Sequence, residues 1–243
     1  MNNSICLVTA VDVEFKTAVG LLSQTVLSTE SNFTICRGRI GNRHVTVLQC
    51  GMGARGFAEW LGGHLENNHY DALIVVGLAG GLDPKLKTGD AVVYDLCLNV
   101  VGQSAKLYCD EHLTEALFRA LQAASLQSLC GTGITVSRII TGAADKLRLG
   151  EECLALAVDM ESFDVVDVCL QYDVPIAVVR VISDEAGHDL PDFNYAAEPD
   201  GTMNHRRMAI AMVRRPKASI RFLRSLKIVL EAFRKSLEVV LRV

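Results

Sequence analysis

The sequence lacks the patterns that mark membrane-spanning, metal-binding and nucleic-acid-binding proteins. No apolar run approaches the roughly 18 residues that a transmembrane helix needs. No two of the eight cysteines lie closer together than Cys97 and Cys109, which excludes a CxxC zinc or redox motif. We therefore expect free thiols in a reducing compartment and no metal site. A net charge of −4 argues against a chain that binds nucleic acid over its whole surface.

The remaining composition is that of a globular protein, with 50% hydrophobic and 21% charged residues. The first residues, MNNSICLVT, carry no basic cluster ahead of their short apolar run. We expect them to form a first strand and not a signal peptide. Together with the free thiols, this favours a cytoplasmic protein.

Short apolar runs alternate with amphipathic ones, and this alternation predicts an α/β fold. The runs ALIVV and PIAVVRVI are almost continuously apolar, which is typical of strands covered on both faces. We expect three layers, with a central mixed β-sheet flanked by helices, and a C-terminal helical extension. Residues 1–200 would form the catalytic domain, and residues 201–243 a basic amphipathic extension of the same domain. Expected strands are 5–9, 33–39, 44–49, 72–76, 91–94, 133–136, 156–158 and 176–182, and expected helices are 13–23, 56–67, 111–124, 143–149, 162–172 and one from 219 onward.

Chemistry-bearing residues follow three of the expected strands. ALIVV runs into GLAGG at 77–81, whose glycines let backbone N–H groups approach a ligand, although neither GxGxxG nor a P-loop lysine is present. Asp159 and Glu161 stand where a strand opens into a helix, a place that suits either helix capping or a cleft. Asp184 follows the last buried strand, as a turn former or a site residue. Ligands of open α/β sheets bind beyond the carboxyl ends of the strands, where such residues gather.

Taken together, these runs resemble the purine nucleoside phosphorylase/nucleosidase superfamily. The resemblance covers residues 5 to about 187 and implies an enzyme that breaks the bond between a purine and C1′ of its ribose. It is carried by AVDVE at 10–14, CGMG at 50–53, GLAGGL at 77–82, VDMES at 158–162 and RVISDEAG at 180–187.

The resemblance implies a role for each matching residue. Asp184 would protonate the leaving purine, Glu161 would bind ribose hydroxyls, and Glu14 would activate water if the enzyme is a hydrolase. A phosphorylase instead needs cationic and N–H donors for phosphate, which would then be a co-substrate; no cofactor is implied. The candidates to bind phosphate are Gly53, Arg55 and Arg138. The expected substrate-binding residues are Ala79, Gly80, Gly81, Ile139, Val158, Asp159, Met160 and Ser183.

The resemblance also implies a homo-oligomer. The sequence departs from the family's pattern in two places. Leu78 stands where the family often has Ser or Thr, which removes a hydroxyl near the nucleophile. No aromatic residue occurs at 137–140, where the family's purine-stacking aromatic is expected. We therefore expect an aliphatic contact with the base.

The C-terminal segment is basic and amphipathic. From Arg206 to Val243, eleven Lys or Arg stand against two Glu, and apolar residues recur at helical spacing from Leu223 to Val240. Such a helix can pack on its own domain, or it can hold the protein on an anionic membrane such as the inner membrane surface. PDG at 199–201 and RRP at 214–216 are similar to the hopanoid-associated phosphorylases, which implies adenosylhopane, a lipid nucleoside, as substrate.

Three functions compete on this basis. The first is phosphorolytic cleavage of an adenine nucleoside, with adenosylhopane as the candidate substrate. The second is hydrolysis of 5′-methylthioadenosine or S-adenosylhomocysteine, which Glu14 favours and the basic tail does not. The third is a non-catalytic nucleoside-binding module. The joint presence of Glu161 and Asp184 argues against the third, because binding alone requires no acid.

Overall fold

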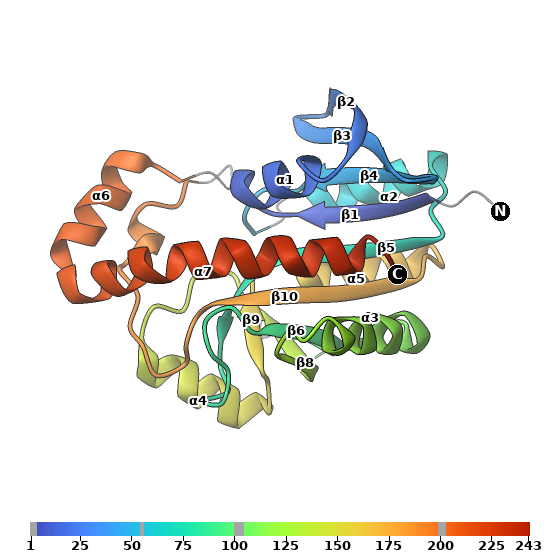
Figure 1. The fold of residues 1–243 in the computed structure, drawn as a ribbon. Helices are drawn as coiled ribbons and strands as arrows, with labels where there is room; N and C mark the ends of the chain where they lie inside the picture. The colour runs from blue at the N-terminus through green and yellow to red at the C-terminus, as the bar shows by residue number, and fades with distance from the viewer. Residues whose placement is uncertain (1–3, 54–55, 100–104, 199–202) are drawn as a thin grey trace.

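The computed structural model describes residues 4–53, 56–99, 105–198 and 203–243, and a ten-stranded mixed sheet lies at its centre (Figure 1). The expected α/β class, a central sheet flanked by helices with a C-terminal helix, is confirmed. The strands are β1 (Ser4–Thr9), β2 (Ser23–Glu30), β3 (Phe33–Ile40), β4 (Arg43–Gln49), β5 (Ala72–Gly81), β6 (Ala91–Asn99), β7 (Lys106–Tyr108), β8 (Ser128–Thr135), β9 (Ala157–Asp159) and β10 (Ile176–Asp184). The helices are α1 (Asp12–Val19), α2 (Phe57–Asn67), α3 (Glu111–Ala123), α4 (Ala143–Cys153), α5 (Ser162–Gln171), α6 (His205–Arg214) and α7 (Pro216–Val240), with a 3₁₀ turn at Phe193–Tyr195.

The sheet closes on itself at one side. Its strands are ordered β10-β6-β8-β9-β5-β1-β4-β3-β2, with β7 beside β6, and β10 also pairs with β5. Strands β5, β10, β6, β8 and β9 therefore form a ring. Within it, Gly80 of β5 is paired with Val158 of β9 on one side and with Asp184 of β10 on the other. The ring thus brings three motifs that are distant in the sequence to one place.

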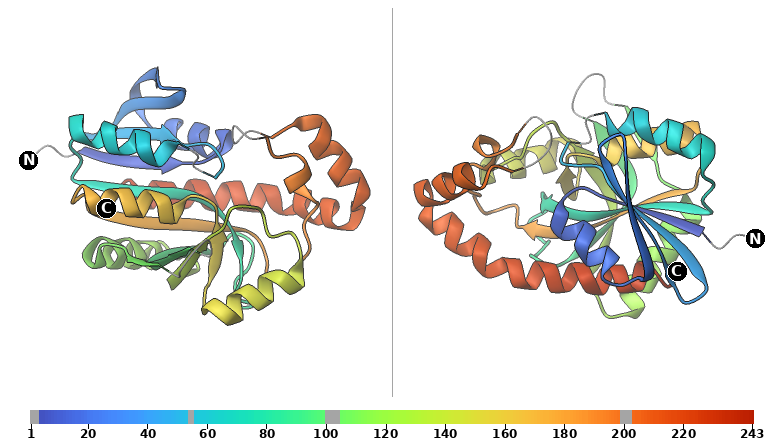
Figure 2. Two further views of the ribbon diagram at one scale, coloured as in Figure 1. Left: turned by 180° about the vertical axis from the view of Figure 1, so that it is seen from behind. Right: turned by 90° about the horizontal axis from the view of Figure 1, so that it is seen from above.

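Helices cover both faces of the sheet, as Figure 2 shows from above. On one face α2 and α5 bury apolar side chains such as Leu61 and Val166 against the strands. On the other face α1, α3 and α7 do the same with residues such as Phe15, Leu117 and Phe233. Because β5 and β10 are covered on both sides, all of β5 is apolar, and so is β10 up to Ile182 apart from Arg180.

Helix α7 divides into two halves with different surroundings. Its C-terminal half buries Val229, Phe233, Leu237 and Val240 against the sheet. This half therefore packs on its own domain, which is one of the two alternatives for the C-terminal segment. Its N-terminal half, which begins at Pro216, a favoured residue for a first helical turn, leaves Leu223 exposed. Within the described residues no helix is long and apolar enough to cross a membrane. The division of the chain at residue 200 stays a prediction, because residues 199–202, which include the whole PDG run, lie outside the described part.

Several predicted boundaries were wrong. The first helix ends at Val19, not at residue 23, and Ser23–Glu30 forms an edge strand that a two-residue turn joins to β3. Helix α6 and the short β7 were not predicted. Strand β5 continues to Gly81, so the glycines expected in a turn instead lie in a strand.

Candidate active site

A cavity of about 260 Å³ opens where β1, β5, β9 and β10 end. Glu14, Glu161 and Asp184, the three expected catalytic residues, all line it. The structure therefore brings together carboxyl groups from the first helix, the start of α5 and the end of β10. The other expected residues that line it are Ala79, Gly80, Arg138, Ile139, Val158, Asp159, Met160 and Ser183.

Among the expected residues that the structure describes, Gly81 and Gly53 do not line this cavity. Gly81 pairs with Ala157 of β9, and a Cβ added to it would lie 3.1 Å from the backbone oxygen of Asp184, so its small size serves close strand packing. Gly53 lies behind Glu161, and its backbone N–H donates a 3.0 Å hydrogen bond to Glu161 Oε1. In this structure the Gly53 N–H therefore positions a carboxylate.

Arg180 is the buried cation at the centre of the site, and sequence reasoning took it only as part of a strand. Its guanidinium lies 3.2 Å from Glu161 Oε2 and 3.2 Å from Asp159 Oδ2, and it also donates to Ser162 Oγ at 2.9 Å. The signal was present in the sequence: a single Arg inside the apolar run PIAVVRVI must find a partner, because an unpaired buried charge is very costly.

An acid between β9 and α5 was expected either to cap the helix or to reach into a cleft. Asp159 does the first and Glu161 does the second. Asp159 accepts hydrogen bonds from Thr135 Oγ1 and from the backbone and side chain of Ser162, which fastens the start of α5. Burial alone would raise the pKa of Asp159, but Arg180 and these donors outweigh it and hold the pKa below its usual value. Glu161 extends into the cavity. Burial raises the pKa of Glu161 to about 7, although Arg180 acts in the opposite direction.

Glu14 is held by backbone groups of two segments. Its Oε2 accepts from the N–H groups of Ala10 and Val11 at 2.8 and 3.1 Å, and its Oε1 accepts from Leu78 N–H at 2.8 Å. Burial raises the pKa of Glu14 above its usual value, against the opposing charge of Arg180 and these three donors. A fixed carboxylate with a raised pKa is suited to accept a proton from water.

Gly77 provides the space that Glu14 and Arg180 occupy. A Cβ at this position would overlap Arg180 Nη1 and would lie 2.9 Å from Glu14 Oε1. The first glycine of the GLAGG run is therefore required by the size of the charged groups beside it, since its backbone has an ordinary strand conformation.

Asp184 has two partners that fix its carboxylate. Lys146 on α4, which is completely buried, donates to Asp184 Oδ2 at 2.7 Å and to the backbone oxygen of Glu185 at 2.7 Å. Ser183 Oγ lies 2.6 Å from Asp184 Oδ1. Sequence reasoning did not single out Lys146, because nothing in the amphipathic pattern of its helix marks the residue.

Aromatic residues reach the cavity from a part of the chain where sequence reasoning did not look for them. Phe193 from the 3₁₀ turn and Phe222 from α7 line it, with ring centroids 5.0 Å apart in an edge-to-face arrangement. Ile139 and Ile140 also line the wall, as the expected aliphatic contact would. The aromatic surface thus comes from the C-terminal quarter of the chain.

The expected phosphate site stays a prediction, because Arg55 lies outside the described residues. Of the other two candidates, Arg138 is exposed at the cavity wall and Gly53 donates to Glu161.

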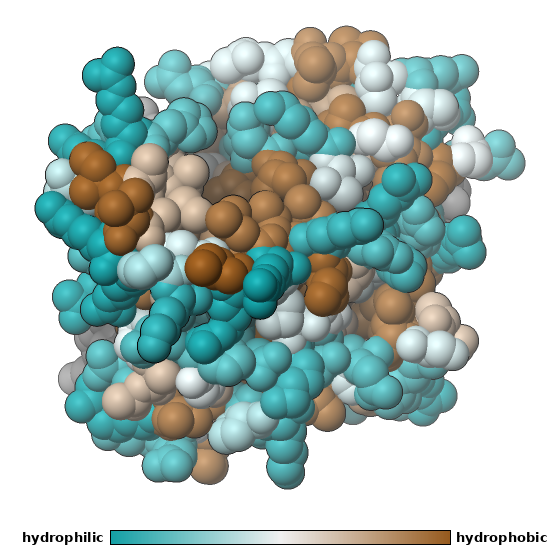
Figure 3. Space-filling model, turned by 60° about the vertical axis from the view of Figure 1, so that its left-hand side comes forward, coloured by the Kyte–Doolittle hydropathy of each residue, from teal (hydrophilic) through white to brown (hydrophobic). Residues whose placement is uncertain are grey.

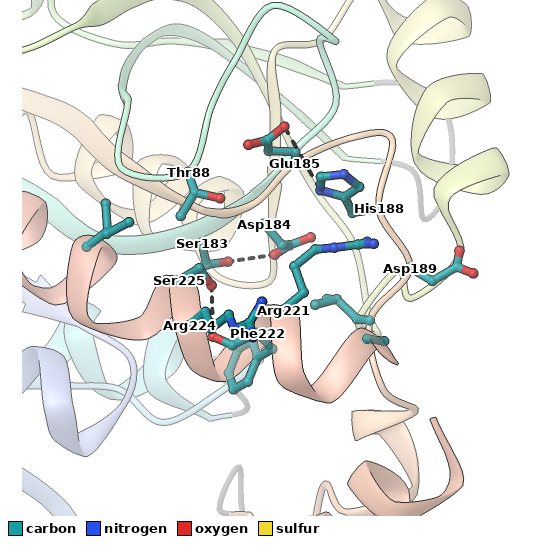
Figure 4. Close-up of a pocket in the computed structure, with 13 residues that line it drawn as sticks. Thr88, Ser183, Asp184, Glu185, His188, Asp189, Arg221, Phe222, Arg224 and Ser225 are labelled. Atoms are coloured by element: carbon teal, nitrogen blue, oxygen red, sulfur yellow. Dashed lines mark hydrogen bonds and ion pairs between the residues drawn. The ribbon is translucent and has the colours of Figure 1, made fainter. Parts of the chain in front are cut away.

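A second cavity, of about 250 Å³, adjoins the first and shares Ser183, Asp184, Leu190 and Phe222 with it. Figure 4 shows Ser183 and Asp184, at the end of β10, across from Arg221, Phe222 and Arg224 on α7. The two cavities extend the site along α7.

Comparisons with known proteins agree with this geometry. The profile of the Phosphorylase superfamily matches residues 4–215. A 5′-methylthioadenosine/S-adenosylhomocysteine nucleosidase of Glaesserella parasuis is 25% identical over 197 residues, which cover 75% of this chain and 86% of that protein.

Solved structures share the fold at lower identity. The 5′-methylthioadenosine/S-adenosylhomocysteine nucleosidase of Neisseria meningitidis, in complex with methylthio-immucillin-A, superposes with a TM-score of 0.77 at 18% identity, over 99% of this chain and 100% of that one. The futalosine hydrolase of Helicobacter pylori gives 0.70 at 19% identity, over 95% and 99%. None of these relatives is a hopanoid-associated phosphorylase, so that part of the resemblance is not supported.

Proposed function

The chain belongs to the Phosphorylase superfamily, and from this premise we propose that it hydrolyses the N-ribosidic bond of an adenine nucleoside of the 5′-methylthioadenosine/S-adenosylhomocysteine class. The observation that carries the proposal is the shared cavity of Glu14, Glu161 and Asp184. The name of the Glaesserella parasuis relative supports the substrate class.

Each carboxyl group has a task in this reaction. Glu14 takes a proton from a water molecule, whose oxygen bonds to C1′ of the ribose. The bond from C1′ to the purine breaks, its electron pair stays with the purine, and Asp184 delivers a proton to the imidazole ring of the base. Glu161 accepts hydrogen bonds from ribose hydroxyls and places negative charge near a sugar that becomes positive in the transition state. The products are the free base and the free sugar.

Hydrolysis is favoured over phosphorolysis by the charges around the cavity. Glu14 and Glu161 would both repel a phosphate dianion, and Arg180, the buried cation beside them, is already paired with Asp159 and Glu161. Water needs a base and no cation, which Glu14 satisfies.

The acid is best described as the pair of Asp184 and Lys146. An ammonium group 2.7 Å from the carboxylate carries a proton that can pass to Asp184 Oδ2 as the base departs. The pair is buried, so this proton does not depend on water reaching the base.

The decisive experiment measures adenine release from 5′-methylthioadenosine, S-adenosylhomocysteine and adenosine in phosphate-free buffer, and then with added phosphate. We expect equal rates in both buffers and a free reducing sugar as product. Asp184→Asn should lower kcat roughly 10²- to 10⁴-fold, while Asp145→Asn, at an exposed site on the same helix as Lys146, should not change it. A sugar phosphate as product, or a strict need for phosphate, would establish phosphorolysis instead. Full activity of Asp184→Asn would overturn the assignment of the acid.

A further inference from the structure

One surface of the protein combines exposed apolar side chains with unneutralised cations. We call it the basic apolar face and define it by the exposed residues of α6 and of the N-terminal half of α7: Arg206, Ile210, Val213, Arg214, Lys217, Ile220, Leu223, Arg224 and Lys227. On the side of the molecule turned forward in Figure 3, apolar and hydrophilic side chains alternate around a hollow.

The apolar residues of this face are too exposed to serve the core. Val213 is 80% exposed, Leu223 55%, Ile220 52% and Ile210 42%. Helical spacing puts Ile220, Leu223 and Lys227 on one side of α7, whereas the buried Val229 lies on another side. The same spacing puts Arg206, Ile210 and Val213 on one side of α6, with Ala211 buried. Each helix therefore has a buried face of its own and a second apolar face directed outward.

The charge of this region is of one sign. From His205 to Leu230 the chain holds eight Lys or Arg and no acidic residue. In the described part of the chain, Arg207 is the one among the eight that forms an ion pair, with Glu198 at 3.4 Å. Like charges this close in sequence repel one another, so the cations do not stabilise the helices. An anionic partner would neutralise these cations and relieve their repulsion.

Two other partners fit this face poorly. In a symmetric contact between two copies, the same patch of each copy meets the other, which would press one set of cations against its own kind. A nucleic acid backbone would satisfy the cations but would leave exposed Ile, Val and Leu side chains facing phosphates. An anionic lipid surface fits both the cations and the apolar side chains of this face. Headgroups neutralise Lys and Arg, while apolar side chains enter the boundary between headgroups and acyl chains.

We propose that α6 and the N-terminal half of α7 dock the protein onto an anionic lipid surface. The helices lie on the surface and do not cross it. Phe222, which lines both cavities, stands next to Leu223 of the docking face, so docking would bring the site close to the lipid. The proposal is independent of the proposed function, because the four exposed apolar residues that carry it, Ile210, Val213, Ile220 and Leu223, line neither of these cavities.

Sedimentation with vesicles tests the proposal on the full chain. We expect binding to vesicles that contain phosphatidylglycerol, little binding to pure phosphatidylcholine, and release by high salt because exposed charges are screened. The variant Val213→Asp, Ile220→Asp, Leu223→Asp should bind at least tenfold more weakly. Arg206→Glu with Lys227→Glu should also bind more weakly, since each cation near an anionic surface strengthens binding roughly fivefold. The matched control is Val26→Asp with Leu27→Asp on β2, where the exposures are 65% and 64%.

The outcomes are distinct. Unchanged adenine release by the triple variant, with unchanged circular dichroism, would show that lost binding is not lost folding. An equal loss of binding in the β2 control would overturn the proposal, as would wild-type protein that stays in the supernatant with anionic vesicles. If light scattering shows that the triple variant converts a dimer to a monomer while the wild type ignores vesicles, the face is an interface between copies.

Discussion

Lys146 Nζ lies 2.7 Å from Asp184 Oδ2, and this lysine has no exposed surface. Its second contact, to the backbone oxygen of Glu185, holds it beside the strand end. In the proposed reaction Lys146 would position the acid and supply its proton. The site depends on α4 as well as on the three strands that carry its motifs.

Replacing this lysine should affect the chemical step more than substrate binding. For Lys146→Met we expect kcat to fall roughly 10- to 100-fold, a part of what a general acid contributes, with a much smaller change in KM. Lys146→Arg should recover part of the rate, and Lys85→Met, at an exposed site, should behave as wild type. A lower melting temperature with unchanged kcat and KM would mean a purely structural role.

Glu161 should make stability depend on pH. Its pKa rises from 4.5 to about 7 on folding, so the folded protein binds this proton more tightly than the unfolded chain does. The stabilisation is fully present below pH 4.5 and is lost as the pH rises to about 7, with an upper bound of about 3 kcal/mol. Urea unfolding of wild type and Glu161→Gln across this range measures it. The difference in unfolding free energy between the two proteins should change with pH and level off above neutrality. A pH-independent difference would contradict the raised pKa.

Gly77→Ala should damage both activity and folding. A methyl group at this position overlaps Arg180 Nη1 and crowds Glu14, so one of the two must leave its hydrogen-bonded place. We expect a loss of roughly 2 to 4 kcal/mol of stability, typical of a disrupted buried charge network, and a large loss of kcat. The control is Gly63→Ala on α2, where nothing lies within 4 Å of an added Cβ, and where alanine should stabilise the helix by up to about 1 kcal/mol.

Phe222 should contribute to substrate affinity. Removing its ring with Phe222→Ala takes an aromatic surface from the cavity, and we expect KM to rise roughly 3- to 10-fold, the value of one aromatic contact, while kcat changes less. Leu223→Ala, at the adjacent position that faces outward, should leave KM unchanged. Equal effects of the two substitutions would show that Phe222 acts through the helix and not through contact with substrate.

The sequence predicted the parts of this molecule that local pattern controls. The continuous apolar runs of β5 and β10 predict strands covered by helices on both faces, and the structure confirms them. The sequence did not predict β2, whose residues are mostly exposed and polar, because an edge strand is stabilised by pairing with its neighbour. Helix α6 was missed although Asn204 caps it through a 3.1 Å bond to Arg207 N–H, which is a start signal that the sequence displays.

Contacts between distant segments limited the prediction of the site. Resemblance named Glu14, Glu161 and Asp184, and the structure places them in one cavity. No pattern in the sequence links Lys146 to Asp184 or brings Phe222 to the same wall, because these approaches are set by how α4 and α7 pack on the sheet. Their roles in catalysis remain predictions.

The cluster of Glu14, Asp159 and Glu161 around one guanidinium has a thermodynamic consequence for ligand binding. Burial raises the pKa of Glu161 to about 7, so near neutral pH the empty site exchanges a proton at this carboxyl group. A sugar whose hydroxyls donate to that carboxylate favours its ionised form, so occupancy expels the proton into bulk solution. Binding enthalpies measured by calorimetry should therefore differ between buffers of different ionisation enthalpy, and affinity should rise with pH up to about 7.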